Sequence, residues 1–350
     1  MKDIVAVDLF CGIGGLTRGL SDAGIKVAAG IDLDSSCRFA YEANNDAIFL
    51  NENIENLSGE NILKYYPRGC LKALVGCAPC QPFSKYSSRY RKNGYTDDKW
   101  KLLYSFERLV QEVQPELISM ENVPSLRNQQ IFRDFTSTLV NMDYHIWYQV
   151  IYCPEYGVPQ ERKRLVLLAS KLGEISLIAP EYDVKSFRTV RDAIASLPVL
   201  KAGETDGSDP IHTASKLSKI NYQRIQASKP GGTWRDWDQG LRVSCHTKES
   251  GKTFPSVYGR MEWDRPSPTI TTQFYGYGNG RFGHPEQDRA ISLREGALLQ
   301  SFPRDYIFVD SNHPLKKREL GMHIGNAVPV ALGRAIGESI RLNVKENSSD

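Results

Sequence analysis

The first 170 residues alternate short apolar runs with segments in which apolar side chains recur every three or four positions. Apolar runs bounded by turn residues are typical of buried strands, and the longer spacing is typical of amphipathic helices. The pattern predicts strands at residues 4–10, 26–32, 72–76, 117–122, 144–152 and 164–170, and helices at 16–23, 35–44, 102–113 and 132–142. This alternation indicates an α/β fold with a largely parallel sheet, whose last two strands form an antiparallel pair.

The pattern changes near residue 180. Residues 180–290 are rich in Gly, Pro, Ser and Thr and contain few periodic segments, which indicates a smaller, loop-rich second domain. Helices are predicted at 292–300 and 331–342, with a frayed tail at 343–350. We therefore expect a first domain of residues 1–180, rejoined by 320–350, and a second domain of residues 181–319.

Composition narrows the class of protein. The chain has 350 residues, 41% hydrophobic and 24% charged, as expected for a soluble enzyme. Its 7 cysteines are scattered, which argues against a secreted disulfide framework and favours a reducing compartment. No apolar stretch is long enough to span a membrane, and the strand pattern at residue 4 leaves no room for a signal peptide. We expect a cytoplasmic protein without a membrane partner.

The charge distribution points to nucleic acid more than the net charge of +3 does. Basic residues are concentrated in two loop-like segments, 85–101 and 216–252, which also carry Tyr and Trp. Either segment alone could be an ordinary solvated surface. Two such segments around a candidate active site favour contact with a phosphate backbone.

A glycine turn follows the first predicted strand, in the stretch DLFCGIGG from Asp8 to Gly15. Glycines allow close backbone approach to a ligand, and Asp32, twenty residues after Gly12, lies where an acid can bind ribose hydroxyls. The spacing differs from G-x-G-x-x-G. It predicts a nucleotide-like cofactor and leaves a nicotinamide or flavin oxidoreductase open.

The stretch GCAPCQPFS, Gly76 to Ser84, contains a C-x-x-C pair with three interpretations. A redox pair is disfavoured because this chain is about three times the length of a thioredoxin domain. A zinc site is disfavoured because no second ligand pair has suitable spacing. A nucleophilic Cys80 at the carboxyl end of a parallel strand is the remaining reading, although two buried thiols would explain the bare pair.

Two further motifs place charges beside this strand end. Glu121, in MENVPSL, ends an apolar strand, where a carboxylate must be ion-paired or catalytic. In QERKR, Arg162 and Arg164 lie on one face of an extended segment. Alone this would be a charged surface turn, but beside an acid and a thiolate it predicts a clamp for a polar base or phosphate.

In order and spacing, DLFCGIGG, GCAPCQPFS, ENV, QERKR and the late GNAVP resemble the C5-cytosine DNA methyltransferases. The stretch from Arg289 to Tyr306 also resembles this family, and the similarity covers nearly the whole chain except about 180–260. The resemblance implies a Rossmann-like, S-adenosylmethionine-dependent methyltransferase sheet with a smaller, loop-rich target-recognition domain. The weakly matching segment is where the family carries its variable recognition region.

The resemblance implies a mechanism in which the thiolate of Cys80 adds to cytosine C6 while Glu121 assists at N3. C5 then attacks the methyl group of S-adenosylmethionine, and loss of the C5 proton releases Cys80. Arg162 and Arg164 would hold the pyrimidine. The base must leave the stack, and the basic loop 84–97 would close over it.

The family's cofactor pocket maps onto eleven positions. They are Phe10, Gly12, Gly14, Gly15, Asp32, Leu33, Asn53, Ile54, Leu102, Asn326 and Val328. Two depart from the common pattern: Leu33 stands where an aromatic is frequent, and Asn53 stands where an Asp is usual. The first replaces adenine stacking by apolar contact, and the second leaves an uncharged acceptor for the adenine amino group.

Double-stranded DNA is the implied partner. Arg235 and Arg260 are our candidates for guanine contacts, because a guanidinium can bind O6 and N7 together, although phosphate contact is an equal alternative. Ser84, Gln160 and Thr269 are further expected DNA contacts, and no metal is expected. We further expect a monomer that serves as a bacterial or phage modification enzyme near the nucleoid. A cognate restriction endonuclease is its expected functional partner.

Three alternatives remain at this point. A tRNA cytosine methyltransferase would share the fold, but the second domain is larger than that group typically has. A non-catalytic DNA-binding relative would be expected to lack Cys80, Glu121 or the glycine turn, all of which are present. An oxidoreductase leaves PCQ, ENV and QERKR without a role.

Overall fold

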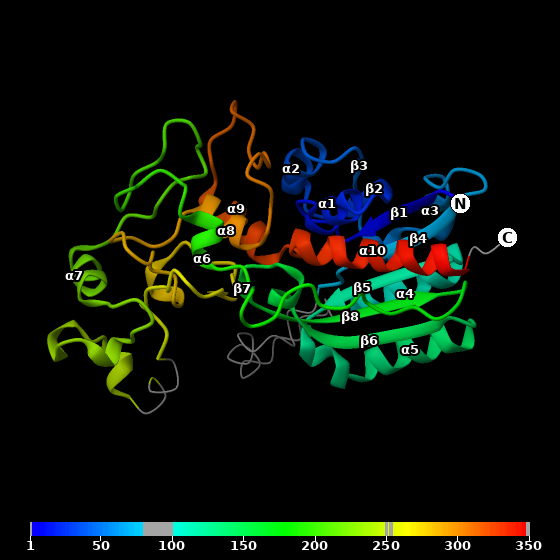
Figure 1. The fold of residues 1–350 in the computed structure, drawn as a ribbon. Helices are drawn as coiled ribbons and strands as arrows, with labels where there is room; N and C mark the ends of the chain where they lie inside the picture. Colours follow the sequence, from blue (N-terminus) through cyan, green and yellow to red (C-terminus); the bar gives the residue numbers. More distant parts are fainter. Residues whose placement is uncertain (1, 80–100, 249–250, 252–254, 348–350) are drawn as a thin grey trace. The chain divides into compact units, whose positions relative to one another are not determined.

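The computed structural model describes residues 2–79, 101–248, 251 and 255–347 (Figure 1). The chain divides into unit 1, residues 1–156, 163–181 and 328–350, and unit 2, residues 157–162 and 182–327. The domain boundaries predicted from sequence differ in two places. Residues 157–162 and 320–327 group with unit 2, because the segment around Gln160 pairs with Ser267 and the helix that ends at Asn326 packs within that unit.

Unit 1 is built on a seven-stranded sheet of order β3-β2-β1-β4-β5-β8-β6. The strands are β1 (Ile4–Leu9), β2 (Lys26–Asp32), β3 (Ile48–Asn51), β4 (Leu71–Gly76), β5 (Leu117–Asn122), β8 (Lys163–Ser170) and β6 (His145–Tyr152). The first five run parallel, whereas β8 pairs antiparallel with both β5 and β6. The predicted α/β class and the antiparallel pair are confirmed.

The central strands are apolar on both faces because both faces are covered. In β5 all six residues are buried, and β1 is buried from Val5 onward. Continuous apolar runs are what a parallel sheet with helices on both faces requires. The strand order turns back at β1, which lies between β2 and β4, and ligands of open α/β sheets bind at the carboxyl ends of strands at such a point.

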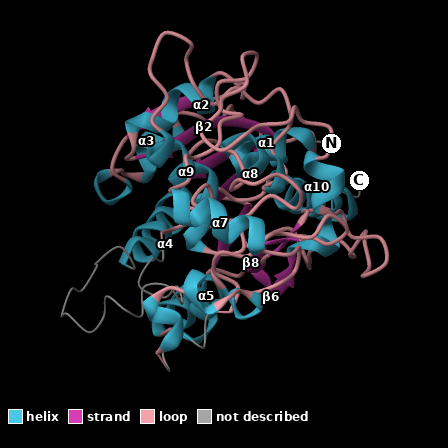
Figure 2. Cartoon of the chain, turned by 90° about the vertical axis from the view of Figure 1, so that its left-hand side faces the viewer, coloured by secondary structure: helices cyan, strands magenta, loops and turns pink. Residues whose placement is uncertain are grey.

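Two groups of helices accompany the sheet, drawn in cyan around the magenta strands in Figure 2. The helices of unit 1 are α1 (Gly15–Asp22), α2 (Arg38–Glu42), α3 (Gly59–Leu63), α4 (Leu102–Val113), α5 (Gln130–Asn141) and α10 (Val330–Asn347). Helix α4 packs against α3 and α5, and α1 packs closely against α10. At Gly19 an added Cβ would lie 2.4 Å from the Val330 carbonyl oxygen, so this helix pair requires glycine.

The chain's last helix extends further than predicted. Residues 343–347 were expected to fray, but they continue α10. Asn343 is buried, its Oδ1 accepts from Ser170 Oγ at 2.7 Å, and its Nδ2 donates to the Glu174 carbonyl at 2.7 Å. The prediction was wrong because the polar residues of this segment face polar partners on β8 and the segment after it.

Unit 2 consists mostly of loops held by short elements. These are β7 (Gln160–Glu161), β9 (Ser267–Pro268), α6 (Val190–Ile194), α7 (Lys219–Ala227), α8 (Leu293–Leu299) and α9 (Lys317–Asn326). Strands β7 and β9 pair in parallel. Helix α8 is buried at every position, and Arg289 beside it donates to both carboxylate oxygens of Glu295 at 2.7 Å. A buried bidentate ion pair therefore replaces part of an apolar core.

Candidate functional site

The glycine turn after β1 adopts backbone angles that suit glycine. Gly14 has φ 86° and forms the N-cap of α1, and Gly12 has φ 51°. Asp32 Oδ2 accepts a hydrogen bond from the Gly12 amide at 2.9 Å, which ties the end of β2 to the turn. A Cβ added at Gly12 would meet nothing within 4 Å, so the turn faces open space. Phe10 also has a positive φ, 60°, and is half-buried.

A buried carboxyl group lies beneath this turn. Asp8 is 1% exposed, its Oδ2 accepts from Thr17 Oγ1 at 2.7 Å, and that hydroxyl lies 3.1 Å from the hydroxyl of Tyr41. Burial raises the pKa of Asp8 from 3.8 to about 7; the Thr17 hydrogen bond opposes this shift and the charge of Asp32 adds to it. Burial, with Asp8 and Asp32 nearby, also raises the pKa of the Cys11 thiol. The glycine turn therefore lies above a carboxyl group whose pKa is close to neutral pH.

The other predicted cofactor residues of unit 1 differ in how exposed they are. Leu33 follows Asp32 and is 68% exposed, an unusual position for a large apolar side chain without a ligand. Asn53 is half-buried, and its Oδ1 accepts from the Glu55 amide at 3.0 Å, where it caps a short helical turn. Ile54 and Val328 are buried, and Leu102, at the start of α4, is half-buried.

An acid and an arginine meet at the end of β5. Glu121 is 2% exposed, and its Oε1 lies 2.7 Å from Arg164 Nε. The antiparallel register explains the pair, because Asn122 lies opposite Leu165, one residue from Arg164. Glu121 Oε2 also accepts from the Cys77 thiol at 2.8 Å. The structure thus brings Glu121 together with Arg164 and with the first cysteine of C-x-x-C.

The loop after β4 is fixed to the same strand end. Asn122 Nδ2 donates to the Ala78 carbonyl at 2.9 Å, so the residues that lead to Cys80 run beside the end of β5. Cys80 and Ser84 themselves lie outside the described residues. The described residues Cys77 to Pro79 follow directly on the carboxyl end of β4, the edge of the sheet where the sequence predicted the nucleophile.

Gln160 and Arg162 of QERKR are buried within unit 2, whereas Glu161 between them is exposed. Gln160 is 0% exposed, and its Nε2 donates to the Leu299 carbonyl at 2.9 Å and to Gln300 Oε1 at 2.8 Å. Arg162 is 2% exposed and donates to the carbonyls of Ile270 at 3.1 Å and Gly325 at 3.3 Å. These positions do not support the predicted DNA contact of Gln160 or the predicted pyrimidine contact of Arg162. Arg164 of the same motif instead lies beside Glu121, at 2.7 Å.

Arg260 also differs from its predicted role. It is 5% exposed, and its guanidinium donates to the carbonyls of Ile225, Ser228, His284 and Gln287 and pairs with Asp288. A side chain whose donors are taken by its own unit does not present them to a guanine edge. Arg260 joins three segments of unit 2.

Arg235 remains at the surface. It is exposed, and its guanidinium lies 5.5 Å from the ring centre of Trp234. Trp234 in turn stacks on His246 at 4.2 Å with an interplanar angle of 16°. The predicted DNA contact Thr269 is half-buried and its hydroxyl donates to the Glu161 carbonyl at 2.5 Å. Arg235 therefore stands on an aromatic cluster at the surface of unit 2, whereas Thr269 reinforces the β7–β9 pairing.

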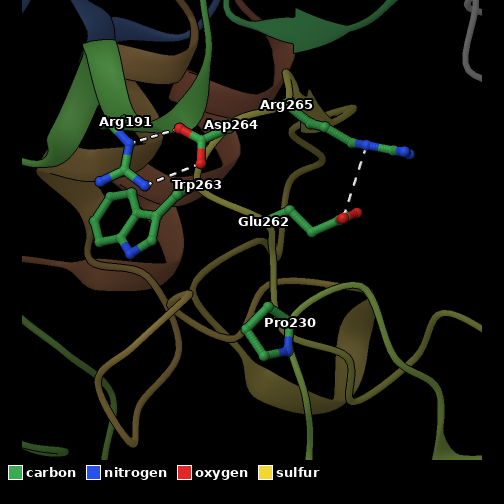
Figure 3. Close-up of a pocket in the computed structure, with 6 residues that line it drawn as sticks. All are labelled: Arg191, Pro230, Glu262, Trp263, Asp264 and Arg265. Atoms are coloured by element: carbon green, nitrogen blue, oxygen red, sulfur yellow. Dashed lines mark hydrogen bonds and ion pairs between the residues drawn. The ribbon is translucent and has the colours of Figure 1, made fainter.

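Unit 2 also has a shallow hollow, lined by Arg191, Pro230, Glu262, Trp263, Asp264 and Arg265 (Figure 3). Arg191 pairs with Asp264 at 2.6 Å and lies 5.3 Å from the ring centre of Trp263, and Arg265 lies 3.7 Å from Glu262. The charges that border the hollow are thus paired with each other. None of the predicted site residues lines it.

Sequence reasoning missed two features. Thr17 and Tyr41 orient Asp8 through their hydroxyl groups, and Gln300 accepts a hydrogen bond from Gln160. The signal for the first was present, since Asp8 ends an apolar strand as Glu121 does. For Gln300 the signal was a lone amide at the end of an apolar helix, LREGALLQ, which pattern reasoning treats as a helix end.

The Rossmann-like sheet, with a glycine turn after β1 and the Glu121–Arg164 pair at the end of β5, fits the S-adenosylmethionine-dependent methyltransferases, and the comparisons establish that class. The profile of the C-5 cytosine-specific DNA methylases matches residues 4–342. The chain therefore belongs to the C-5 cytosine-specific DNA methylase family. It is an enzyme that transfers a methyl group to cytosine C5, which sets aside the oxidoreductase reading.

Individual relatives agree. The chain is 53% identical to the Type II methylase M.HgiDII of Herpetosiphon aurantiacus over 96% of this chain and 94% of that protein. It is 30% identical to the Type II methyltransferase M1.HphI of Haemophilus parahaemolyticus, over 97% and 87%. A solved structure of a protein encoded within an E. coli prophage has the same fold, with a TM-score of 0.74 at 23% identity, over 98% of this chain and 100% of that one. Among the described residues, no helix is long and apolar enough to cross a membrane.

S-adenosylmethionine is the cofactor of this family, and the residues of unit 1 fit it. The turn at Gly12 faces open space, and the exposed Leu33 offers apolar surface beside Asp32. The carboxylate of Asp32 lies at this turn, which suits a cofactor that carries a positive sulfonium. Asp32 already accepts from two backbone amides, and a carboxylate retains lone pairs for a ribose hydroxyl.

Proposed function

We propose that the chain methylates one cytosine within a specific short sequence of duplex DNA, through a covalent bond between Cys80 and cytosine C6. The observation that carries the proposal is the buried Glu121, paired with Arg164 at 2.7 Å beside the loop that leads to Cys80. A buried carboxylate needs such a partner, and a carboxylate held at the end of a parallel strand is well placed to act on a ligand.

In this proposal the residues act in sequence. The Cys80 thiolate forms a bond to C6 while the Glu121 carboxyl group donates a proton to N3, which makes C5 an enamine carbon. Bound S-adenosylmethionine supplies an electrophilic methyl group. C5 would take up that methyl group, which leaves the sulfur that carried it as a neutral thioether. A base then removes the C5 proton, the C6–S bond breaks to return the Cys80 thiolate, and N3 gives its proton back to Glu121. Arg164 holds Glu121 in place and offers its remaining guanidinium donors to the pyrimidine carbonyl.

The remaining predicted residues enter the proposal according to their positions. Phe10, Gly12, Gly14, Gly15, Asp32, Leu33, Asn53, Ile54, Leu102, Asn326 and Val328 bind the cofactor. Arg235 contacts DNA from an exposed turn of unit 2, and Ser84 contacts it from the basic loop. Arg162 and Gln160 are positioning residues, because both are buried. Unit 2 is the target-recognition unit and unit 1 is the catalytic unit.

The biological setting is part of the proposal. The relatives are Type II methylases of bacteria, which supports a bacterial modification enzyme acting on DNA in the cytoplasm. A cognate restriction endonuclease would recognise the same sequence, and the enzyme would act as a monomer.

The test is bisulfite sequencing of plasmid DNA from a host that expresses the protein, beside a host that expresses Cys80→Ala. Protected cytosines in one short sequence, absent with Cys80→Ala, are the expected result. Protection that persists in Cys80→Ala would remove Cys80 as the nucleophile. Protection of tRNA cytosines with none in DNA would shift the substrate to RNA.

A variant of Arg164 provides a second test of the proposal. Arg164→Lys keeps a charge near Glu121 but loses the planar guanidinium, so we expect methylation to fall by about ten-fold or more while the protein stays folded. The exposed Arg265→Lys is the matched control. Equal activity of both variants would show that the Glu121–Arg164 pair only stabilises unit 1.

A further inference from the structure

The GNAVP turn ends a helix whose terminal carbonyls are bound by side chains from distant parts of unit 2. Helix α9 ends at Asn326. The last carbonyls of a helix have no partner within it and must be satisfied from outside. Here Gln300 Nε2 donates to the Ile324 carbonyl at 2.7 Å and lies 3.4 Å and 3.5 Å from those of Gly325 and Ala327.

Arg162 binds the same helix end from another direction. Its Nη2 donates to the Gly325 carbonyl at 3.3 Å, and its Nη1 donates to the Ile270 carbonyl at 3.1 Å. A cation at the C-terminus of a helix is also favoured by the helix dipole. An added Cβ at Gly325 would lie 2.5 Å from the backbone of Thr271, so the turn lies directly on that segment.

Gln160 joins the two side chains into one network. Its Nε2 donates to Gln300 Oε1 at 2.8 Å, and its Oε1 accepts from the Ile270 amide at 2.8 Å and lies 3.4 Å from Arg162 Nη1. Gln160 and Gln300 are 0% exposed and Arg162 is 2% exposed. In a buried network each hydrogen bond is strong, and each group left without a partner is costly, so the geometry is held closely.

The backbone held by this network is that of the residues on either side of Asn326. Carbonyls on both sides of it, those of Ile324, Gly325 and Ala327, lie within reach of Gln300, whereas the Asn326 side chain itself is exposed. An anchored backbone on both sides of an exposed amide is the arrangement that preorganises a binding group.

We infer that Gln300, with Gln160 and Arg162, is a positioning residue for cofactor binding, and that it acts by fixing the backbone on either side of Asn326. The inference rests on the proposed contact of Asn326 with S-adenosylmethionine. It assigns a role to Gln300, and it replaces the base-contacting role of Arg162 by a positioning role.

The test measures S-adenosylmethionine binding to the full chain by titration calorimetry, so it needs no methylation activity. Asn326→Ala removes one hydrogen-bonding side chain, and we expect the Kd to rise about three- to ten-fold. Gln300→Met is close to isosteric but cannot donate, and we expect a similar rise. In the double variant Asn326→Ala/Gln300→Met, the Kd should match that of Asn326→Ala alone, because Gln300 acts through Asn326.

The controls separate positioning from folding. Gln239→Met changes an exposed amide of unit 2 and should leave the Kd unchanged. If Gln300→Met does not fold, Arg162→Lys, which keeps a cation at the helix end, takes its place in the cycle.

The outcomes are distinguishable. Additive losses in the double variant, or an unchanged Kd in Gln300→Met beside a weakened Asn326→Ala, overturn the positioning role alone. An unchanged Kd in Asn326→Ala overturns the proposed cofactor contact of Asn326 and the inference with it. Neither outcome bears on Cys80, which the bisulfite experiment tests.

Discussion

Asp8 offers the sharpest test of the electrostatics around the glycine turn. In the folded chain its pKa is raised from 3.8 to about 7 by burial, against the hydrogen bond of Thr17 and with the charge of Asp32. Between these two values the folded protein holds a proton that the unfolded chain has lost. The stability contribution of Asp8 is therefore complete below about pH 4 and is lost as the pH rises through about 7.

The magnitude follows from the size of the shift. A shift of about 3 pKa units corresponds to about 4 kcal/mol in the free energy of unfolding once the pH is well above 7. Between pH 5.5 and pH 8 the part that changes is about 2 kcal/mol. Asp8→Asn removes this titration. It also places an amide NH₂ where Asp8 Oδ1 has no hydrogen-bond partner, at a cost of about 1–3 kcal/mol that is the same at both pH values.

We therefore expect the stability of Asp8→Asn, relative to the native chain, to improve by about 2 kcal/mol when the pH is raised from 5.5 to 8. Urea unfolding followed by far-ultraviolet circular dichroism at both pH values measures this difference. The exposed Asp46→Asn controls for the loss of one acidic side chain. A difference between Asp8→Asn and the native chain that does not change with pH would refute the raised pKa.

Two predictions concern unit 2. Arg260→Ala should destabilise the protein by about 3–5 kcal/mol in urea unfolding, because it leaves Asp288 and several carbonyls without their donor. The control Arg265→Ala, at an exposed position, should change the stability little. Loss of discrimination at one base pair, with the stability unchanged, would instead support a guanine contact by Arg260. Burial opposes ionisation of Glu295, but the hydrogen bonds and charge of Arg289 lower its pKa to about 2, so its stability contribution is present above about pH 4.5 and is lost as the pH falls. The stability gap between the native chain and Glu295→Gln should accordingly narrow by about 1–2 kcal/mol from pH 5 to pH 3.5 in the same assay, and a gap that widens would contradict this sign.

The elements predicted best were those whose signal is local. Strand 26–32, helix 102–113 and strand 117–122 were predicted with their observed bounds, since apolar residues at one period define each of them. The polar segment 343–347 was predicted wrongly because its partners on β8 lie more than 150 residues away. Helix α9 was not predicted at all, since its buried residues are interspersed with Gly, Lys and Arg.

The same distinction applies to the site. Glu121 was found because a carboxylate in an apolar strand must be ion-paired or catalytic, but its partner Arg164 was not predicted and follows from the strand register. The burial of Arg260 and Arg162 could not be read from sequence. An arginine is exposed or buried according to how many carbonyls surround it, and those carbonyls belong to residues 24 to 163 positions away.

Helix α10 has a consequence for how the chain is made. It packs on α1 through the contact at Gly19, and it follows the whole of residues 182–327 in the sequence. On the ribosome, unit 2 leaves the exit tunnel before the last helix of unit 1 exists, so α1 waits for its neighbour through about 300 residues of synthesis. At about 5–20 residues per second this interval lasts some tens of seconds. During that time the apolar face of α1 depends on chaperones or transient contacts, and a slow stretch of codons before residue 330 would prolong its exposure.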